Sequence, residues 1–304
     1  PIMALIGLGD GAINASTHFP CPGYFRLGNR IIRCHGHEYN TSLSTSIAKS
    51  CNTYYCYAFK SMMQLDKYKN TKEAYNSWRS YLESFGFGST LGIDVNGDRG
   101  GWLKTAEYYD QMHGKDRWNY ARIISLAFGQ GELGVTPLQM ANAAAAIANR
   151  GFYYTPHVIK QFEGLDTIPS KYLIKHRTKV APEYFDAVIE GMNAVTIRGT
   201  SAGSAIPGIE IGGKTGTVQN PHGKNHSAYM AFAPIDDPKI AIAVVVEESG
   251  YGATWAAPIA HLMIEKYILP DTVESSRGYL RDRLMNADLI PVKYKQALDT
   301  LYNE

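Results

Sequence analysis

Helical spacing of apolar residues dominates the first 200 residues of the chain. From about Thr41 to Phe59, apolar and small side chains recur every three or four positions, which predicts one largely buried helix. Thr136 followed by Pro137 is typical of a helix start, because threonine caps free backbone N–H groups and proline fits the first turn. The same spacing predicts helices over 1–8, 71–85, 136–149 and 182–195.

The last third of the chain has a different pattern, with short strand-like runs rich in β-branched residues. Three such runs cover 209–218, 227–233 and 240–247, and a Pro-Ile-Asp-Asp-Pro turn separates the last two. Runs joined this closely predict an antiparallel sheet. A helix over 254–267 carries an apolar stripe, which we expect to pack on one face of that sheet.

Two segments lack either pattern. Residues 12–40 contain turn formers and short strand-like pieces, which predict an irregular loop with a small hairpin turning at Gly28-Asn29. The segment 271–304 is charged, and we expect it to be a peripheral tail.

Composition narrows the class of protein. Apolar residues make up 45% of the 304 residues and charged residues 19%, as in a soluble globular protein. The formal net charge is only +2, and Lys and Arg are scattered among acids, so we expect no nucleic-acid partner. The longest apolar stretches fall short of the roughly 18 residues needed to cross a bilayer.

Candidate chemistry begins with the tetrapeptide Lys214-Thr215-Gly216-Thr217 on the first predicted strand. Lys-Thr-Gly is one of three motifs found in β-lactamases and penicillin-binding proteins, together with Ser-x-x-Lys and a Ser-x-Asn type motif. Alone, the match also fits an edge strand that a lysine protects from aggregation. A second motif, Ser50-Cys51-Asn52, lies upstream and gives the first its context.

With these two motifs, Gly129-Gln130-Gly131 and the helix start at Thr136-Pro137, the chain resembles the transpeptidase domain of class B penicillin-binding proteins of the elongation type (penicillin-binding protein 2). The resemblance implies a penicillin-recognising α/β (α+β) fold, in which helices flank an antiparallel sheet. It implies that 1–270 form a partial transpeptidase domain, with a helical lobe over 41–200 and the sheet and last helix over 209–267.

The resemblance also implies an activity and residue roles. Such enzymes cross-link peptidoglycan stem peptides that end in D-Ala-D-Ala, and β-lactam antibiotics mimic that unit. Ser50 would relay protons to the leaving group, Asn52 would bind the substrate's peptide amide, and Lys214 would support the proton network. Thr215, Gly216 and Thr217 would form the substrate-binding strand, with the threonines on the substrate carboxylate. The parent would face the periplasm from the inner membrane, with a glycosyltransferase of the elongation machinery as partner.

One motif of the family is missing. The nucleophile motif Ser-x-x-Lys should stand immediately before Pro1, so we expect a chain cut just after it and inactive by itself. A literal match occurs at Ser46 to Lys49, but it abuts Ser50 on the same predicted helix, whereas the family draws its two motifs from different helices. We therefore do not expect Ser46 to be the nucleophile. The alternatives are a serine β-lactamase and a non-catalytic, zinc-stabilised binding module.

Cysteine and histidine residues gather near the Ser-x-Asn motif. Cys21, Cys34, His37 and Cys51 would make a Cys₃His site for structural zinc, with His35 as the other candidate imidazole. Two alternatives compete with zinc. Cys21 and Cys34 could form a disulfide, or the thiols, including Cys51 and Cys56, could be free and buried.

Overall fold

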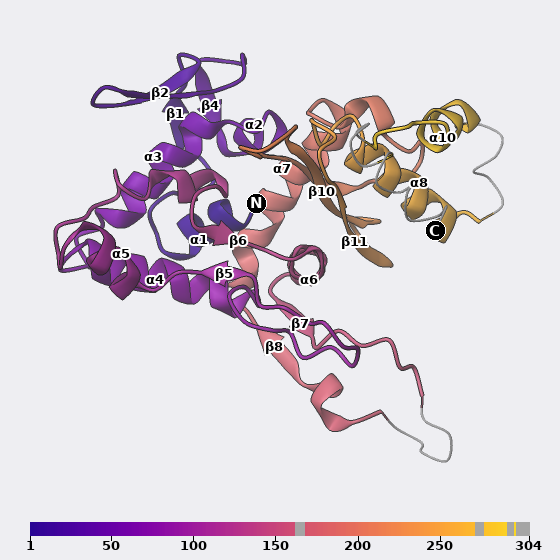
Figure 1. Ribbon diagram of the computed structural model, residues 1–304, viewed down its shortest axis with the longest axis horizontal. Helices are drawn as coiled ribbons and strands as arrows, with labels where there is room; N and C mark the ends of the chain where they lie inside the picture. The colour runs from indigo at the N-terminus through magenta and orange to yellow at the C-terminus, as the bar shows by residue number, and fades with distance from the viewer. Residues whose placement is uncertain (162–167, 271–276, 291–294, 296–304) are drawn as a thin grey trace.

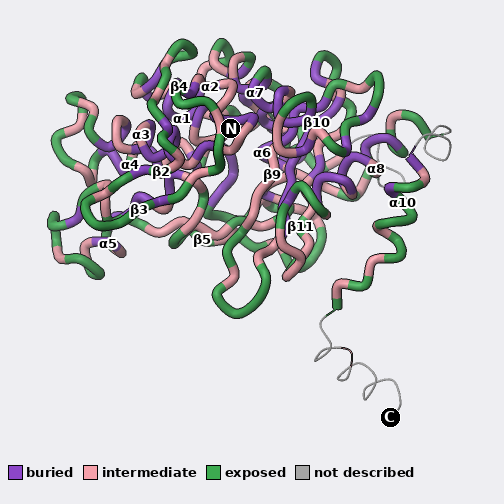
Figure 2. The backbone as a smooth tube through the Cα atoms, turned by 90° about the horizontal axis from the view of Figure 1, so that it is seen from above, coloured by how far each residue is buried: buried purple, intermediate pink, exposed green. Residues whose placement is uncertain are grey.

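A computed structural model describes residues 1–161, 168–270, 277–290 and 295 of the chain. Figure 1 shows a helical lobe on one side of the view and an orange sheet with its covering helix on the other, with α7 (Phe185–Ile197) lying between them. Buried residues run from the helical lobe through α6 (Pro137–Ala148) and α7 into β10 (His226–Ala233), as Figure 2 shows. The α/β fold expected from the resemblance is confirmed.

The sheet follows the predicted pattern closely. Strands β9 (Gly212–Val218), β10 and β11 (Ile240–Val246) are antiparallel in the order β11-β10-β9. Because side chains alternate along β10, Met230 and Phe232 join the core of the helical lobe, while Tyr229 packs with α8 (Ala256–Ile268) on the opposite face. The first strand begins three residues later than the predicted 209.

Most lobe helices lie where the apolar spacing predicts them. Thr136 caps α6 in a reciprocal capping box, accepting from Gln139 N–H while the Gln139 side chain accepts from Thr136 N–H. The remaining lobe helices are α1 (Ile2–Gly9), α2 (Leu43–Ala48), α3 (Asn52–Met63), α4 (Thr71–Ser84) and α5 (Ala106–His113). Short 3-10 turns cover Ile124–Phe128, Ser170–Leu173, Pro182–Tyr184 and Ala202–Ser204.

The prediction of a single helix from Thr41 to Phe59 is wrong. The chain forms two helices, α2 and α3, separated by a turn in which Ser50 has a left-handed φ of 56°. Ser50 and the literal Ser-x-x-Lys match therefore do not share one helix. A positive φ is costly for a non-glycine residue, so surrounding contacts must hold this turn in place.

Four small strand pairs surround the lobe. The hairpin expected in 12–40 is confirmed, because β2 (Tyr24–Leu27) pairs with β3 (Arg30–Arg33) around Gly28-Asn29. The other pairs join β1 (His18–Pro20) to β4 (Asn40–Ser42), β5 (Trp102–Leu103) to β6 (Leu133–Gly134), and β7 (Phe152–Tyr154) to β8 (Lys175–Arg177).

The expected tail is described only over 277–290 and at 295, and Arg277 anchors it there to the rest of the chain. Arg277 is 5% exposed; it pairs with Glu265 of α8 at 3.2 Å and donates a hydrogen bond to the Ser204 carbonyl at 2.8 Å. Helix α10 (Gly278–Met285) then packs against α8. Among the helices described, none combines the length and apolar character that crossing a bilayer requires.

Candidate functional site

Lys214 joins the two sequence motifs. Its Nζ donates to Ser50 Oγ at 2.9 Å and to the Thr215 carbonyl at 2.8 Å. These contacts bring β9 to the turn between α2 and α3, across 164 residues of sequence. Burial among the surrounding protein atoms lowers the pKa of Lys214 to about 8. An amine of this kind can exchange a proton with the Ser50 hydroxyl near neutral pH.

The left-handed turn at Ser50 is held by hydrogen bonds to the preceding helix. Ser50 N–H donates to the Ile47 carbonyl at 3.3 Å, and Cys51 N–H donates to the Ser46 carbonyl at 2.9 Å. These bonds end α2 and let α3 start in a new direction at Asn52. The strained backbone thereby presents the Ser50 hydroxyl to Lys214, as active sites often use such strain to place a side chain.

Asn52 is the first residue of α3 and faces the same space. Its Nδ2 donates to the Arg33 carbonyl at 3.0 Å, which ties the helix start to the end of the β2–β3 hairpin. The side chain predicted to bind a substrate amide is thus positioned by a backbone group of the cysteine-bearing loop.

Thr215 and Thr217, on the strand predicted to bind substrate, each have a partner from another element. Thr215 Oγ1 lies 2.6 Å from Thr200 Oγ1, in the turn after α7. The Thr217 carbonyl accepts a hydrogen bond from Gln130 Nε2 at 3.2 Å. Gly216 lies between them, and the Gly252 backbone approaches it so closely that a Cβ on Gly252 would come within 2.5 Å of the Gly216 carbonyl.

Two cavities meet at these residues. One, of about 240 Å³, is mostly apolar and includes Ser50, Asn52, Lys214 and Thr215 in its lining. The other, of about 450 Å³, is more polar and extends beyond Thr217 toward the hairpin; its lining includes Arg33, Cys34, His35, Gln130 and Asn225. Five motif residues therefore line two neighbouring cavities that share Asn52 and Phe128: Ser50, Asn52, Lys214, Thr215 and Thr217. We call the two cavities together the cleft.

The literal Ser-x-x-Lys match lies apart from this arrangement. Ser46 is fully buried; its Oγ donates to the Leu43 carbonyl at 2.7 Å and lies 3.2 Å from Tyr55 Oη. Lys49 Nζ donates to the Arg198 carbonyl at 2.7 Å. Ser46 and Lys49 thus bond to different groups, and neither contacts Lys214, so the geometry agrees with excluding Ser46 as a nucleophile.

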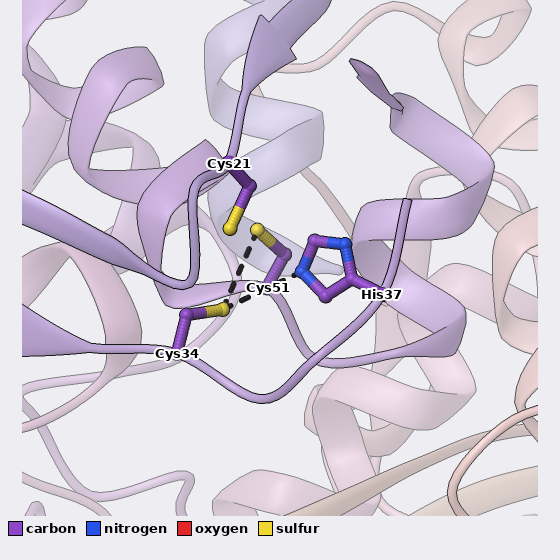
Figure 3. A group of neighbouring side chains, drawn as sticks. All are labelled: Cys21, Cys34, His37 and Cys51. Carbon is purple, nitrogen blue, oxygen red and sulfur yellow. Dashed lines mark hydrogen bonds between the residues drawn. The ribbon is translucent and has the colours of Figure 1, made fainter. Parts of the chain in front are cut away.

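The predicted metal-ligand residues come together in one cluster (Figure 3). The ligand atoms of Cys21, Cys34, His37 and Cys51 all lie within 4.8 Å of one another, so the group could hold a metal ion. Of the two candidate imidazoles, that of His37 belongs to the cluster, whereas His35 lines the larger cavity. Cys56 is buried outside the cluster, and burial raises the pKa of its thiol to about 12.

The surroundings of the cluster favour the metal-binding forms of His37 and Cys34. His37 Nδ1 lies 3.0 Å from the Glu38 carbonyl, to which it can only donate, so Nε2 keeps its lone pair toward Cys34. The contact between the Cys34 and Cys51 sulfur atoms lowers the pKa of the Cys34 thiol and raises the pKa of the Cys51 thiol, so Cys34 is the one of the pair that ionises first. At the start of α3, Tyr54 N–H donates to Cys51 Sγ at 3.2 Å.

Comparison with known proteins agrees with this geometry. The family model "Penicillin binding protein transpeptidase domain" matches residues 1–265. The chain belongs to this transpeptidase family. The resemblance identified from the two motifs is therefore confirmed, and with it the fold.

Relatives of this transpeptidase chain include peptidoglycan D,D-transpeptidase MrdA of Acinetobacter baumannii, 29% identical over 316 aligned residues that cover 96% of the chain. Stage V sporulation protein D of Bacillus subtilis is 32% identical over 59% of the chain. The crystal structure of Pseudomonas aeruginosa PBP2 in complex with WCK 5153 matches with a TM-score of 0.76 and 28% identity, covering 89% of this chain and 58% of that one. The chain spans 45% of the A. baumannii protein and 28% of the B. subtilis protein.

Three contacts of the transpeptidase cleft are not predicted from the sequence: the Arg33 carbonyl on Asn52, Thr200 on Thr215, and Gln130 on Thr217. The Gly-Gln-Gly segment contributes to the resemblance, but the sequence assigns Gln130 no role. Its two glycines around a glutamine were the available clue, because they are typical of a loop that presents one side chain at a fixed place.

Proposed function

We propose that the protein containing this chain is a peptidoglycan D,D-transpeptidase of the elongation type, acting on stem peptides that end in D-Ala-D-Ala and binding β-lactams as acyl-serine adducts. The observation that carries the proposal is the Lys214–Ser50 hydrogen bond beside the Thr215–Thr217 strand. It combines a proton-relay pair with a strand on which a peptide can lie, at the junction of two cavities.

Each residue has a role that follows from its position. Lys214, whose pKa is about 8, keeps the Ser50 hydroxyl hydrogen-bonded and passes protons through it to the leaving amine. Asn52, held by the Arg33 carbonyl, orients the peptide amide of the substrate. Thr215 and Thr217 hold the terminal carboxylate, and Thr217 N–H supplies one donor to the developing oxyanion.

For the cluster we propose structural zinc. In a tetrahedron with Zn–S near 2.3 Å and Zn–N near 2.0–2.1 Å, neighbouring sulfurs lie about 3.8 Å apart and a sulfur and a nitrogen about 3.5 Å apart. Cys34 Sγ lies 3.7 Å from Cys51 Sγ and 3.5 Å from His37 Nε2. Bound zinc would link the hairpin loop to the start of α3 and supplies no group to the reaction.

The proposal includes a location and partners. The family resemblance implies the periplasmic face of the inner membrane and a glycosyltransferase of the elongation machinery as partner. Cofractionation of the complete protein with inner membranes, and its crosslinking to such a glycosyltransferase, would test both; recovery in the cytosol would contradict the location.

The decisive experiment uses the protein encoded by the complete gene. It is incubated with a fluorescent penicillin, and the acylated residue is mapped by mass spectrometry. We expect a long-lived adduct on a serine of a Ser-x-x-Lys motif outside residues 1–304. Lys214→Ala should slow acylation at least roughly 100-fold, because general acid–base groups contribute that much. Lys224→Ala, an exposed lysine in the loop after β9, is the matched control and should leave the rate unchanged.

Each other result points to a different protein. Rapid release of hydrolysed penicillin would make the protein a serine β-lactamase, and no labelling would leave a zinc-stabilised binding module. Labelling at Ser46 or Ser50 would contradict the roles given to the α2–α3 turn.

A further inference from the structure

The Gln130 side chain reaches across the cleft to the substrate strand. Its Nε2 donates to the Thr217 carbonyl at 3.2 Å, joining the helical lobe to β9 across 87 residues of sequence. Among the strands described, β9 pairs only with β10, so its other edge has no strand beside it. A side-chain amide thus bonds to the strand residue that lies where the two cavities approach each other.

The backbone that carries Gln130 is firmly held. Gly129 and Gly131 have φ values of +76° and +80°, a region that glycine enters without cost. Gln130 N–H donates to the Ser125 carbonyl at 3.0 Å, and a Cβ on Gly131 would lie 2.5 Å from Ser125 Oγ. Releasing the Thr217 carbonyl therefore requires only a rotation of the Gln130 side chain, while the Gln130 N–H can stay bonded to Ser125.

The same segment separates the two cavities. Phe128 and Asn52 line both, Gly129 lines the apolar one, and Gln130 and Thr217 line the polar one. The Gln130–Thr217 bond lies at this boundary, so an extended peptide running along β9 from one cavity to the other would meet it.

Extended peptides bind sheet edges by exchanging backbone hydrogen bonds with the edge strand. The Thr217 carbonyl is an acceptor for such a peptide, and Gln130 supplies the amide N–H that the peptide would otherwise donate. We propose that Gln130 is a specificity latch, displaced only by a ligand whose own backbone N–H replaces it on the Thr217 carbonyl. This inference rests on the proposed function, because it takes the ligand to be a peptide ending in D-Ala-D-Ala.

If Gln130 is a latch, removal of its side-chain amide should increase the affinity for the peptide. One neutral hydrogen bond contributes about 1 kcal/mol net, so a ligand that need not break it should bind about fivefold more tightly. Isothermal titration calorimetry of the 304-residue chain with an acetylated tripeptide ending in D-Ala-D-Ala measures this. We expect the Kd to fall about fivefold in Gln130→Ala and in Gln130→Met, which keeps the side-chain length but cannot donate. Gln111→Ala, at an exposed glutamine of α5, should not change the Kd.

A second ligand tests whether displacement of Gln130 requires a backbone N–H on the ligand. The same tripeptide N-methylated at the first D-Ala cannot donate there, so it should bind wild type more weakly than the parent peptide does. Its Kd should nevertheless fall about fivefold in Gln130→Met, as for the parent peptide, because no latch then has to be displaced by either ligand. Unchanged or weaker binding of the parent peptide by both Gln130 variants would overturn the proposal.

Failure of the proposed function can be distinguished from failure of the latch. If neither wild type nor variants bind the D-Ala-D-Ala peptide, the assigned ligand is wrong and the specificity latch fails with it. An NMR scalar coupling across the hydrogen bond from Gln130 Nε2 to the Thr217 carbonyl carbon reports on the contact itself. If the peptide binds wild type and this coupling persists in the complex, the function stands and the latch is refuted; its loss on binding supports the latch.

Discussion

His261 should make the protein less stable in mild acid. This imidazole, on α8, is fully buried; Nδ1 lies 2.6 Å from the Ser204 carbonyl and Nε2 lies 2.8 Å from Tyr229 Oη. The neutral ring therefore donates through Nδ1 and accepts the Tyr229 hydroxyl through Nε2. A second proton would remove that acceptor and place a charge in the core, near the Arg277–Glu265 ion pair. Burial, assisted by Arg277, lowers the pKa of His261 to about 4 from 6.5.

The sign and size of the effect follow from linkage. Between pH 6.5 and pH 4 the unfolded chain binds a proton at His261 that the folded chain does not. The stabilising contribution is therefore complete above pH 6.5 and is lost as the pH falls toward 4. At about 1.4 kcal/mol per unit, the full loss is about 3 kcal/mol, of which about 2 kcal/mol is lost by pH 5.

Urea unfolding of wild type and His261→Gln at pH 7, 6 and 5 measures this contribution. Glutamine can still bond to both partners but does not titrate, and carboxylates that titrate in both chains cancel in the difference. We expect the stability difference between the two chains to shift by about 2 kcal/mol between pH 7 and pH 5, with wild type losing more. Parallel pH profiles would refute the reasoning. If the variant does not fold, an NMR titration of His261 in wild type decides, and a midpoint near the ordinary 6.5 would also refute it.

Two further predictions concern the packing of β9 against Tyr229 and the Cys₃His cluster proposed to bind zinc. Gly213→Ala would put a Cβ 1.9 Å from Tyr229 Oη and 2.6 Å from Tyr229 Cζ, so the Tm should fall by several degrees. Gly203→Ala, where a Cβ meets nothing within 4 Å, should leave the Tm unchanged. Protein purified without added zinc should contain about one equivalent of metal, and Cys34→Ser should contain less than half as much, while Cys56→Ala keeps it. Less than half an equivalent in wild type would contradict the zinc site.

The sheet and most helices could be predicted because the residues that specify each of them are close together in sequence. Strand runs, the Pro-Ile-Asp-Asp-Pro turn and the Thr136 capping box each depend on a few neighbouring residues, and the structure confirms them. The small pairs β5–β6 and β7–β8 were not predicted, because each strand has only two or three residues and no pattern of its own.

The break at Ser50 could not be predicted from the same information. Apolar spacing continues from α2 into α3 without a glycine or proline to mark an end, and serine is not a residue that favours positive φ. The turn exists because tertiary contacts hold it, among them Lys214 on Ser50 and the cluster sulfurs around Cys51. At Ser50, contacts between residues far apart in sequence therefore override the local helix propensity.

The candidate site, like the fold, could be predicted only in part. The motif residues Ser50 and Lys214 could be named because their order and type resemble a family, and the structure brings them within hydrogen-bond distance. Gln130 and Thr200 could not be assigned a role, because a single side chain has no periodicity and its partner depends on how the lobe packs on the sheet.

The tripeptide Ser50-Cys51-Asn52 links the metal cluster to the cleft through three successive residues. Ser50 bonds to Lys214 on β9, Cys51 contributes its sulfur to the cluster and caps α3, and Asn52 bonds to the Arg33 carbonyl beside Cys34. Because the Ser50 backbone is strained, a metal ion that draws Cys51 toward Cys34 would also fix the turn that aims the hydroxyl at Lys214. If the proposed zinc is bound there, its removal should therefore disturb the cleft as well as the hairpin.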